Sequence, residues 1–257
     1  MADGSVAGLA PLKGKVSEDE WHARVELAAL YRLVALYGWD DMIYTHISAR
    51  VPGPDHHFLI NPYGQWFGEI TASSLVKIDC DGNILQETPY FINPAGFTIH
   101  SAVHMNRDDA HYVMHLHTDQ GVAVAAQKEG LLPLSQHSLI VLPRLAYHDY
   151  EGIALNEAEK PRLVQDLGRN TYLMLRNHGL LTVGPSIADA FLAMYMFETT
   201  CQIQLAAQAG GPLTQVHPQI VAGVAESMRV QTASQGGAFV WPALLRKLDR
   251  MDASYRT

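Results

Sequence analysis

The spacing of apolar residues predicts alternating helices and strands along most of the chain. Apolar positions recur at helical intervals after Ser17, which can cap a helix together with Glu20, and Gly38 ends this pattern. Segments rich in β-branched and aromatic residues follow, separated by Pro-Gly, Pro-Tyr-Gly and Asp-Gly turns. They predict strands within residues 43–51, 57–61 and 74–85.

The second half of the chain continues this alternation. Its patterns predict helices around residues 95–106, 120–128, 186–209 and 241–251 and strands within 111–118 and 171–177. We therefore expect one α/β domain over residues 17–257, with helices on both faces of a central sheet. Residues 1–16 lack periodicity and are predicted to form a flexible N-terminal arm, and the helices from about 213 are predicted to pack or to contact other subunits.

Composition narrows the classes of partner. A net charge of -8 argues against a broad nucleic-acid-binding or acidic-membrane-binding surface, so a small-molecule substrate is expected. Cys80 and Cys201 are too few for a disulfide framework, which fits a reducing, cytoplasmic compartment. An uninterrupted apolar run of about 18 residues is absent from the sequence, so no membrane span is expected.

Two histidines stand two residues apart in a segment that is typical of a strand. His115 and His117 would project from the same face, where a pair of imidazoles can bind one cation or can simply line a half-exposed edge. His178 is the candidate for a third ligand, because Gly179 behind it can supply an unusual backbone angle beside a site. Three histidines would leave coordination positions open for a substrate.

Several longer motifs occur in one order along the chain. They are YTHISARVPG, INPYG, TASSLVKIDCDG, NPAGFTIHSAVH, VMHLHT, AYHDYEGI and LRNHGLLTVG. Through these motifs, roughly from Trp21 to Gln208, the chain resembles the class II aldolase/adducin family. The resemblance implies a three-layer α/β domain with a mainly antiparallel sheet and a homotetramer with sites near subunit boundaries.

The resemblance also implies a metal site. The family's ligands match His115, His117 and His178, and the implied cofactor is a divalent metal ion, with zinc favoured and manganese, iron or cobalt as alternatives. Tyr63 and Gly64 lie where the family often lines its substrate pocket, although a simple β-turn explains them equally well.

Two departures from the family's sugar-phosphate aldolases bear on the chemistry. The stretch that carries their catalytic glutamate has Gly96 here, and the serines of their phosphate site are replaced by Pro94 and Ala95. Their phosphate-binding Gly-Asn pair is replaced by Thr45-His46. These replacements indicate a non-phosphorylated substrate and another acid or base.

We expect a metal-dependent lyase that cleaves a carbon–carbon bond by aldol-type cleavage or by decarboxylation, through a metal-stabilised enolate. The substrate would be a hydroxy or oxo carboxylate or a hydroxylated aromatic carboxylate. His46 is the first candidate for the acid or base, followed by Tyr147 and His148 and then by His137. Arg50 is a candidate contact for a substrate carboxylate, and Gly96 is a further candidate for substrate binding.

A different class of function is open as well. Several motifs resemble the adducin head as closely as they resemble the aldolases, so the chain could be a non-catalytic oligomeric binding module. Against this, the sequence lacks a long neck and a basic tail after the domain, which favours catalysis.

Overall fold

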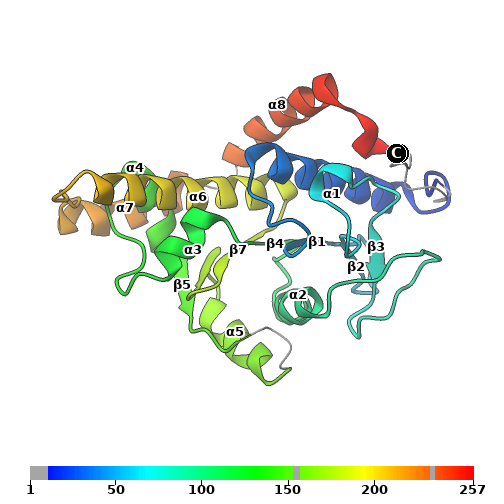
Figure 1. The fold of residues 1–257 in the computed structure, drawn as a ribbon, viewed down its shortest axis with the longest axis horizontal. Coiled ribbons are helices and arrows are strands. Elements are labelled where there is room, and N and C mark those ends of the chain that lie inside the picture. Colours follow the sequence, from blue (N-terminus) through cyan, green and yellow to red (C-terminus); the bar gives the residue numbers. More distant parts are fainter. Residues whose placement is uncertain (1–10, 153–156, 232–234) are drawn as a thin grey trace.

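One seven-stranded sheet separates two layers of helices (Figure 1). The structure, a computed structural model, describes residues 11–152, 157–231 and 235–257. The strands lie in the order β3-β2-β1-β4-β7-β6-β5, and all neighbouring pairs are antiparallel except β5 and β6. Their bounds are β1 His46–Arg50, β2 Phe58–Ile60, β3 Val76–Ile78, β4 Tyr112–Leu116, β5 Leu145–His148, β6 Tyr172–Leu175 and β7 Gly179–Gly184. The predicted three-layer α/β domain with a mainly antiparallel sheet is confirmed.

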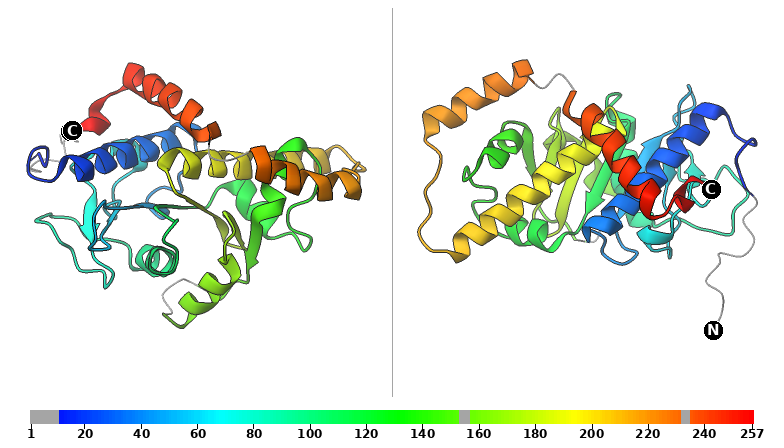
Figure 2. Two further views of the ribbon diagram at one scale, coloured as in Figure 1. Left: turned by 180° about the vertical axis from the view of Figure 1, so that it is seen from behind. Right: turned by 90° about the horizontal axis from the view of Figure 1, so that it is seen from above.

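The helices cover both faces of this sheet. One layer holds α1 (Glu18–Tyr37), α6 (Ile187–Ala209) and α8 (Gln235–Met251), and the other holds α2 (Pro94–Asn106) and α5 (Lys160–Leu167) (Figure 1). The shorter α3 (Asp119–Ala125) and α4 (Gln136–Val141) pack against α6, and α7 (Pro218–Gln231) packs against α4. In the view from above, α8 lies across α1 and α6 (Figure 2).

Alternate strand residues face the two helical layers. Ile47 of β1 belongs to the core shared with α1, α6 and α8, whereas Val113 of β4 belongs to the core shared with α2 and α5. The register pairs Ser48 with Val113 and His46 with His115. Paired residues share a face, so these four side chains project from the side of the sheet that α2 covers.

The predicted limits of α1 are confirmed. The hydroxyl of Ser17 accepts a hydrogen bond from the backbone N–H of Glu20, at 3.2 Å, and Gly38 ends the helix with φ of 69°. This left-handed conformation is available to glycine at little cost.

The strand predictions need two corrections. The strand predicted for residues 74–85 ends at Ile78, because the Asp79 carboxylate accepts N–H groups from Asp81 and Asn83 and closes a turn. Strands β5 and β7 are not predicted at all. All six residues of β7 are buried, so its run GLLTVG lacks the alternation by which a half-buried strand is found.

The C-terminal segment closes back on the first half of the chain. Its last residues bind the loop before β3, where the carbonyls of Tyr255 and Thr257 accept the N–H groups of Ala72 and Ser73. The predicted arm at residues 1–16 falls mainly outside the described residues. In the described parts of the chain, none of the helices combines the length and apolar character that a bilayer crossing needs.

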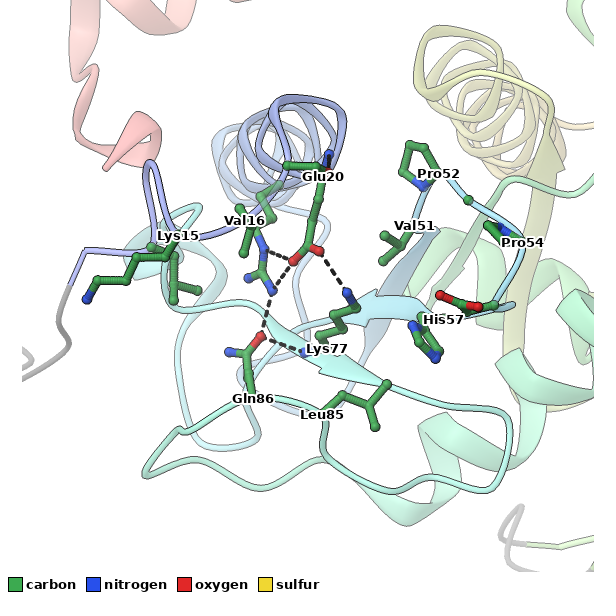
Figure 3. A pocket seen from close by; sticks show the side chains of 15 residues that line it. Lys15, Val16, Glu20, Val51, Pro52, Pro54, His57, Lys77, Leu85 and Gln86 are labelled. Atoms are coloured by element: carbon green, nitrogen blue, oxygen red, sulfur yellow. Dashed lines mark hydrogen bonds and ion pairs between the residues drawn. The ribbon is translucent and has the colours of Figure 1, made fainter.

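A buried ion cluster fastens α1 to β3 (Figure 3). The Arg24 guanidinium is fully buried and donates to the Glu20 carboxylate at 2.9 Å, to the Leu75 carbonyl at 2.8 Å and to the Gln86 side chain at 2.6 Å. Lys77 binds the second oxygen of Glu20 at 2.8 Å. This cluster borders a hollow of about 560 Å³ beside the C-terminal end of β1.

We predict that Arg24→Met lowers the free energy of unfolding by roughly 3–5 kcal/mol, because it leaves a buried carboxylate with one of its charged partners removed. Burial raises the pKa of Glu20, but the hydrogen bond from Lys77 and the charge of Arg24 outweigh it and hold that pKa below 4.5. This contribution to stability is therefore present above pH 4.5 and should be lost as the pH falls through the lowered pKa.

Denaturant titration at several pH values measures both effects. Arg162→Met is the matched control, because its exposed pair with Glu151 should contribute little. Equal losses in the two variants would contradict the prediction.

Candidate metal centre

The three histidines singled out in the sequence converge at one end of the sheet. His115 lies on β4, His117 directly follows that strand, and His178 lies in the turn between β6 and β7. Their ring centroids are separated by 4.8 Å (115 to 117), 4.7 Å (115 to 178) and 4.8 Å (117 to 178). Ligand nitrogens from all three lie within 4.8 Å of one another, as a shared cation would require.

The turn that carries His178 is built differently from the sequence expectation. The residue with a left-handed backbone is Asn177, with φ of 57°, and not Gly179. Gly179 serves another purpose, because a Cβ there would lie 2.5 Å from the Leu116 carbonyl oxygen. The glycine therefore permits the close approach of β7 to β4 that brings His178 to His117.

Two of the rings are held by hydrogen bonds through Nδ1. The carbonyl oxygen of Leu180 lies 3.1 Å from Nδ1 of His115, and the Asp41 carboxylate lies 3.0 Å from Nδ1 of His117. Both partners accept hydrogen bonds, so each Nδ1 carries a proton, and the neutral form of each ring keeps its lone pair on Nε2. The two Nε2 atoms are 3.0 Å apart, in position to bind one ion.

The environment of His115 and His178 favours the neutral form of their rings. Burial, followed by the neighbouring His178 and His117, lowers the pKa of His115 well below its ordinary value. Burial and His117 lower the pKa of His178 to about 4. Neutral imidazole is the ligand form, and the set of three fits zinc and the other divalent metals that accept nitrogen. His115 is 1% exposed, whereas the His117 side chain is 23% exposed, so the cluster is open towards His117.

His46 lies against the same cluster. It pairs with His115 across β1 and β4, and the two ring centroids are 5.2 Å apart. Burial, followed by His117 and His178, lowers the pKa of His46 to about 3. Among the candidates for the acid or base, His46 is therefore placed where it can meet a group bound to the cluster.

Gly96 is in contact with His46. A Cβ at Gly96 would lie 2.6 Å from Cδ2 of the His46 ring, so even an alanine requires that ring to move. The two positions expected to depart from the aldolase pattern therefore lie in contact, because the His46 ring fills the space that a side chain at position 96 would use.

Tyr63 and Gly64 lie near the same end of the sheet. They follow β2, whose last residue pairs with Ser48, and the antiparallel direction brings the chain after Ile60 beside the start of β1. The Tyr31 phenol fixes this arrangement, because it bonds with the backbone of Ile47 and with Asn61. Gly64 has φ of 99°, a backbone conformation that favours glycine, so the turn alone also accounts for a glycine at this position.

Arg50 lies at the opposite end of β1 from His46, about 13 Å away along the strand. Its guanidinium donates to the carbonyls of His104 and Arg107 near the end of α2 and contacts His56. Arg50 thus binds carbonyl groups at the C-terminal end of α2, which accounts for its presence without a substrate. We therefore leave it out of the function proposed below.

The remaining candidates lie farther from the cluster or are held by other groups. The hydroxyl of Tyr147 accepts the N–H of Leu131, and its ring lies 4.2 Å under the Arg176 guanidinium. His148 is buried between Asp166, at 2.7 Å, and Glu159, at 3.3 Å.

His137 lies on α4, which packs against α6 and α7. The structure does not bring Tyr147 or His137 to the three histidines through any contact among the described residues.

Sequence reasoning missed two residues at the cluster. Asp41 comes from the loop after α1, far from the histidines in sequence, and no motif marks it. Tyr150 follows β5, and its ring centroid is 6.2 Å from that of His178. It belongs to the same AYHDYEGI motif as Tyr147, so the motif pointed to the right segment but not to the residue that faces the histidines.

A family model decides the relationship. The model of the class II aldolase and adducin N-terminal domain matches residues 25–205. The chain belongs to this family. Family members include aldolases, and the adducins share the same domain, so membership alone leaves both an enzyme and a binding module open.

Individual relatives come from both branches. A protein named as a candidate class 2 aldolase from Caulobacter vibrioides is 62% identical over 256 residues, which cover 99% of each chain. Alpha-adducin of Rattus norvegicus is 44% identical over 221 residues, 82% of this chain but 30% of that one.

Two solved structures have the same fold. An aldolase II superfamily protein from Pseudomonas syringae has a TM-score of 0.92 with 51% identity and covers 96% of this chain and all of that one. The L-fuculose 1-phosphate aldolase from Glaciozyma antarctica PI12 has a TM-score of 0.82 with 27% identity and covers 97% and 96%.

We predict that Asp41→Ala weakens zinc binding by about 10- to 100-fold, because His117 loses the carboxylate that orients its ring. Isothermal titration of zinc into chelator-treated protein measures this change. The neighbouring carboxylate supplies the control, since Asp40→Ala removes the same charge without touching the bond to His117. Equal affinities for the two variants would show that Asp41 does not support a ligand.

Proposed function

We propose that the protein is a metal-dependent lyase that cleaves a carbon–carbon bond in a non-phosphorylated substrate. The substrate class is a hydroxy or oxo carboxylate or a hydroxylated aromatic carboxylate. His115, His117 and His178 would hold the divalent ion, for which zinc is the preferred candidate.

The observation that carries this proposal is the orientation of the cluster. The Leu180 carbonyl and the Asp41 carboxylate hold protons on Nδ1 of His115 and His117, so both Nε2 lone pairs meet in one place. Histidines that only lined a strand edge would not need this arrangement. The exposed side of His117 would give a substrate access to an ion held there.

When bound, a divalent ion would polarise substrate oxygens and stabilise the negative charge that develops as the carbon–carbon bond breaks. The protein's own residues must then move a proton. In aldol cleavage, a base takes the proton of a substrate hydroxyl, the carbon–carbon bond breaks to give an aldehyde or ketone, and the other fragment keeps the electron pair until it is protonated. His46 is the residue best placed for the first of these steps.

Decarboxylation needs less from the protein. Carbon dioxide leaves, the electron pair of the broken bond stays on the remaining fragment, and a single protonation completes the reaction. The lack of a carboxylate side chain at Gly96 therefore hinders decarboxylation less than aldol cleavage.

The residues around His46 support a non-phosphorylated substrate. In the family's sugar-phosphate aldolases a Gly-Asn pair and serines hold the phosphate, and here these places have Thr45-His46 and Pro94-Ala95. Proline has no backbone N–H to donate, and His46 is neutral because burial lowers its pKa to about 3. The L-fuculose 1-phosphate aldolase is named for a phosphorylated sugar, whereas the residues at these places in this chain favour a substrate without a phosphate.

We predict that His178→Gln abolishes stoichiometric metal binding and lowers turnover at least about 100-fold, because the ion loses one of three ligands. Elemental analysis of the purified protein measures the metal. Release of carbon dioxide or of an aldehyde from a panel of unphosphorylated hydroxy acids, with sugar phosphates beside them, measures the activity. The control is His22→Gln, at a histidine whose side chain is 74% exposed. Full activity in a chelator would refute the proposal.

We predict that Gly96→Ala lowers turnover by roughly 100-fold while metal content stays unchanged, because the added methyl group displaces the His46 ring and leaves the three ligands in place. Gly223→Ala on α7 is the control, since a Cβ there meets no atom within 4 Å. Loss of metal in Gly96→Ala, or unchanged turnover, would contradict the assignment of His46.

The adducin relationship favours a second candidate, a non-catalytic oligomeric binding module. Under this alternative, the wild-type protein would release neither product from any compound of the panel, and removal of metal would leave its oligomeric state unchanged. A homotetramer and a cytoplasmic location remain predictions under both candidates. Light scattering of the purified protein tests the first of them.

A further inference from the structure

A row of buried polar groups runs beneath the metal centre, between β1 and α2. Gly96, His100 and His104 lie four residues apart on α2, so they share one face of the helix. His46 and Ser48 lie two residues apart on β1 and face this side. All four polar side chains are at most 3% exposed.

The groups form an unbroken chain of hydrogen bonds. Nδ1 of His104 lies 2.9 Å from the Ala110 carbonyl oxygen, and its Nε2 lies 2.7 Å from the Ser48 hydroxyl. The same hydroxyl makes a short contact with Nδ1 of His100. Nε2 of His100 lies 2.9 Å from Nδ1 of His46.

Burial favours the neutral form of the two histidines of α2. Burial, followed by the charge of Arg50, lowers the pKa of His104 to about 3. Burial, followed by His46 and His104, lowers the pKa of His100 well below its ordinary value. Each neutral imidazole has one nitrogen that donates and one that accepts.

The carbonyl at one end fixes the direction of every bond. Because the Ala110 oxygen only accepts, His104 donates from Nδ1, and its Nε2 must accept the proton of the Ser48 hydroxyl. The hydroxyl has a single proton, which it donates to His104, so it must accept a hydrogen bond from Nδ1 of His100. Nε2 of His100 then accepts from Nδ1 of His46.

We infer that Ser48, His100 and His104 are positioning residues that keep the proton of His46 on Nδ1, so that its Nε2 lone pair accepts a hydrogen bond from a substrate hydroxyl. The tautomer follows from the hydrogen bonds alone, whereas the substrate contact rests on the proposed function. The His46 ring lies beside Gly96, and its centroid is 5.2 Å from that of His115, so it borders the candidate ligands.

This tautomer carries a consequence for the substrate class. A lone pair attracts a hydroxyl and repels an anionic phosphate oxygen, so the site should prefer a compound with a free hydroxyl at this position. The opposite tautomer would present an N–H and would favour the phosphate. The series of hydrogen bonds from Ala110 to His46 would thus set the preference for a hydroxyl over a phosphate, through groups that do not touch the substrate.

Nuclear magnetic resonance of the purified protein with ¹⁵N-labelled histidine tests the tautomer directly. The two-bond couplings of an imidazole show which nitrogen carries the proton, and the spectrum of His46→Asn identifies the signals of His46. We expect the proton on Nδ1 in the wild-type protein. A proton on Nε2 would overturn the inference, whatever the outcome of the activity measurements.

A serine substitution tests the coupling along the chain. Ser48→Ala removes the hydroxyl between His100 and His104, which frees His100 to reverse, so the His46 signals should shift towards the tautomer with the proton on Nε2. Ser48→Thr keeps a hydroxyl and should restore the wild-type pattern. The control is Ser101→Ala, because Ser101 is also buried but takes no part in this chain of hydrogen bonds. An unchanged His46 tautomer in Ser48→Ala would overturn the inference. If that variant does not fold, the tautomer of His46 in the wild-type protein is the deciding measurement.

Binding of two small probes tests the substrate contact. In protein loaded with zinc, glycolate should shift the Nε2 signal of His46 and should bind roughly tenfold more tightly than 2-phosphoglycolate, which lacks the hydroxyl donor. Ser48→Ala should reduce this preference. Equal or reversed preference in the wild-type protein, with His46 in the expected tautomer, would overturn the substrate contact and leave the positioning chain standing.

Discussion

The antiparallel pairing of β1 with β4 at one register is the constraint on which the candidate site depends. It places His46 directly beside His115, so that a candidate metal ligand and a candidate base project from the same face of the sheet. A slip of one residue would turn every side chain of β1 to the other face. The register is held because Ile47 and Met114 are fully buried in the opposite core, and because the Tyr31 phenol binds the backbone of Ile47.

Helix α2 can complete this site because the rises of a helix and a strand nearly match. Four helical residues advance about 6 Å and two strand residues advance about 6.6 Å. Every fourth residue of α2 therefore lies beside β1. Gly96 and His100 contact His46, and His104 contacts Ser48. The glycine comes where the strand carries its largest ring, His46, so the helix can approach without a clash.

The sequence predicted those helices and strands whose apolar residues recur at regular intervals. The Ser17 cap, the Gly38 stop and the helix up to residue 209 follow from local rules, whereas β7 is buried on both faces and shows no alternation. The three histidines were visible because two share a strand and the third matches a family motif. Asp41 was not, since a loop brings it to His117 from 76 positions away, and nothing in its neighbours signals that contact.

The charge of the centre limits what it can bind. Imidazole ligands would bring no charge to offset that of a divalent ion, and the Asp41 carboxylate is hydrogen-bonded to Nδ1 of His117. His46 beside them adds no charge, because burial lowers its pKa to about 3. A bound ion would therefore depend on the substrate for neutralisation, and a carboxylate next to a hydroxyl or oxo group supplies that charge at the oxygens the ion would hold. Under the proposed function, a bound ion would then supply the main stabilisation, among the described side chains of the centre, for the negative charge of a breaking carbon–carbon bond.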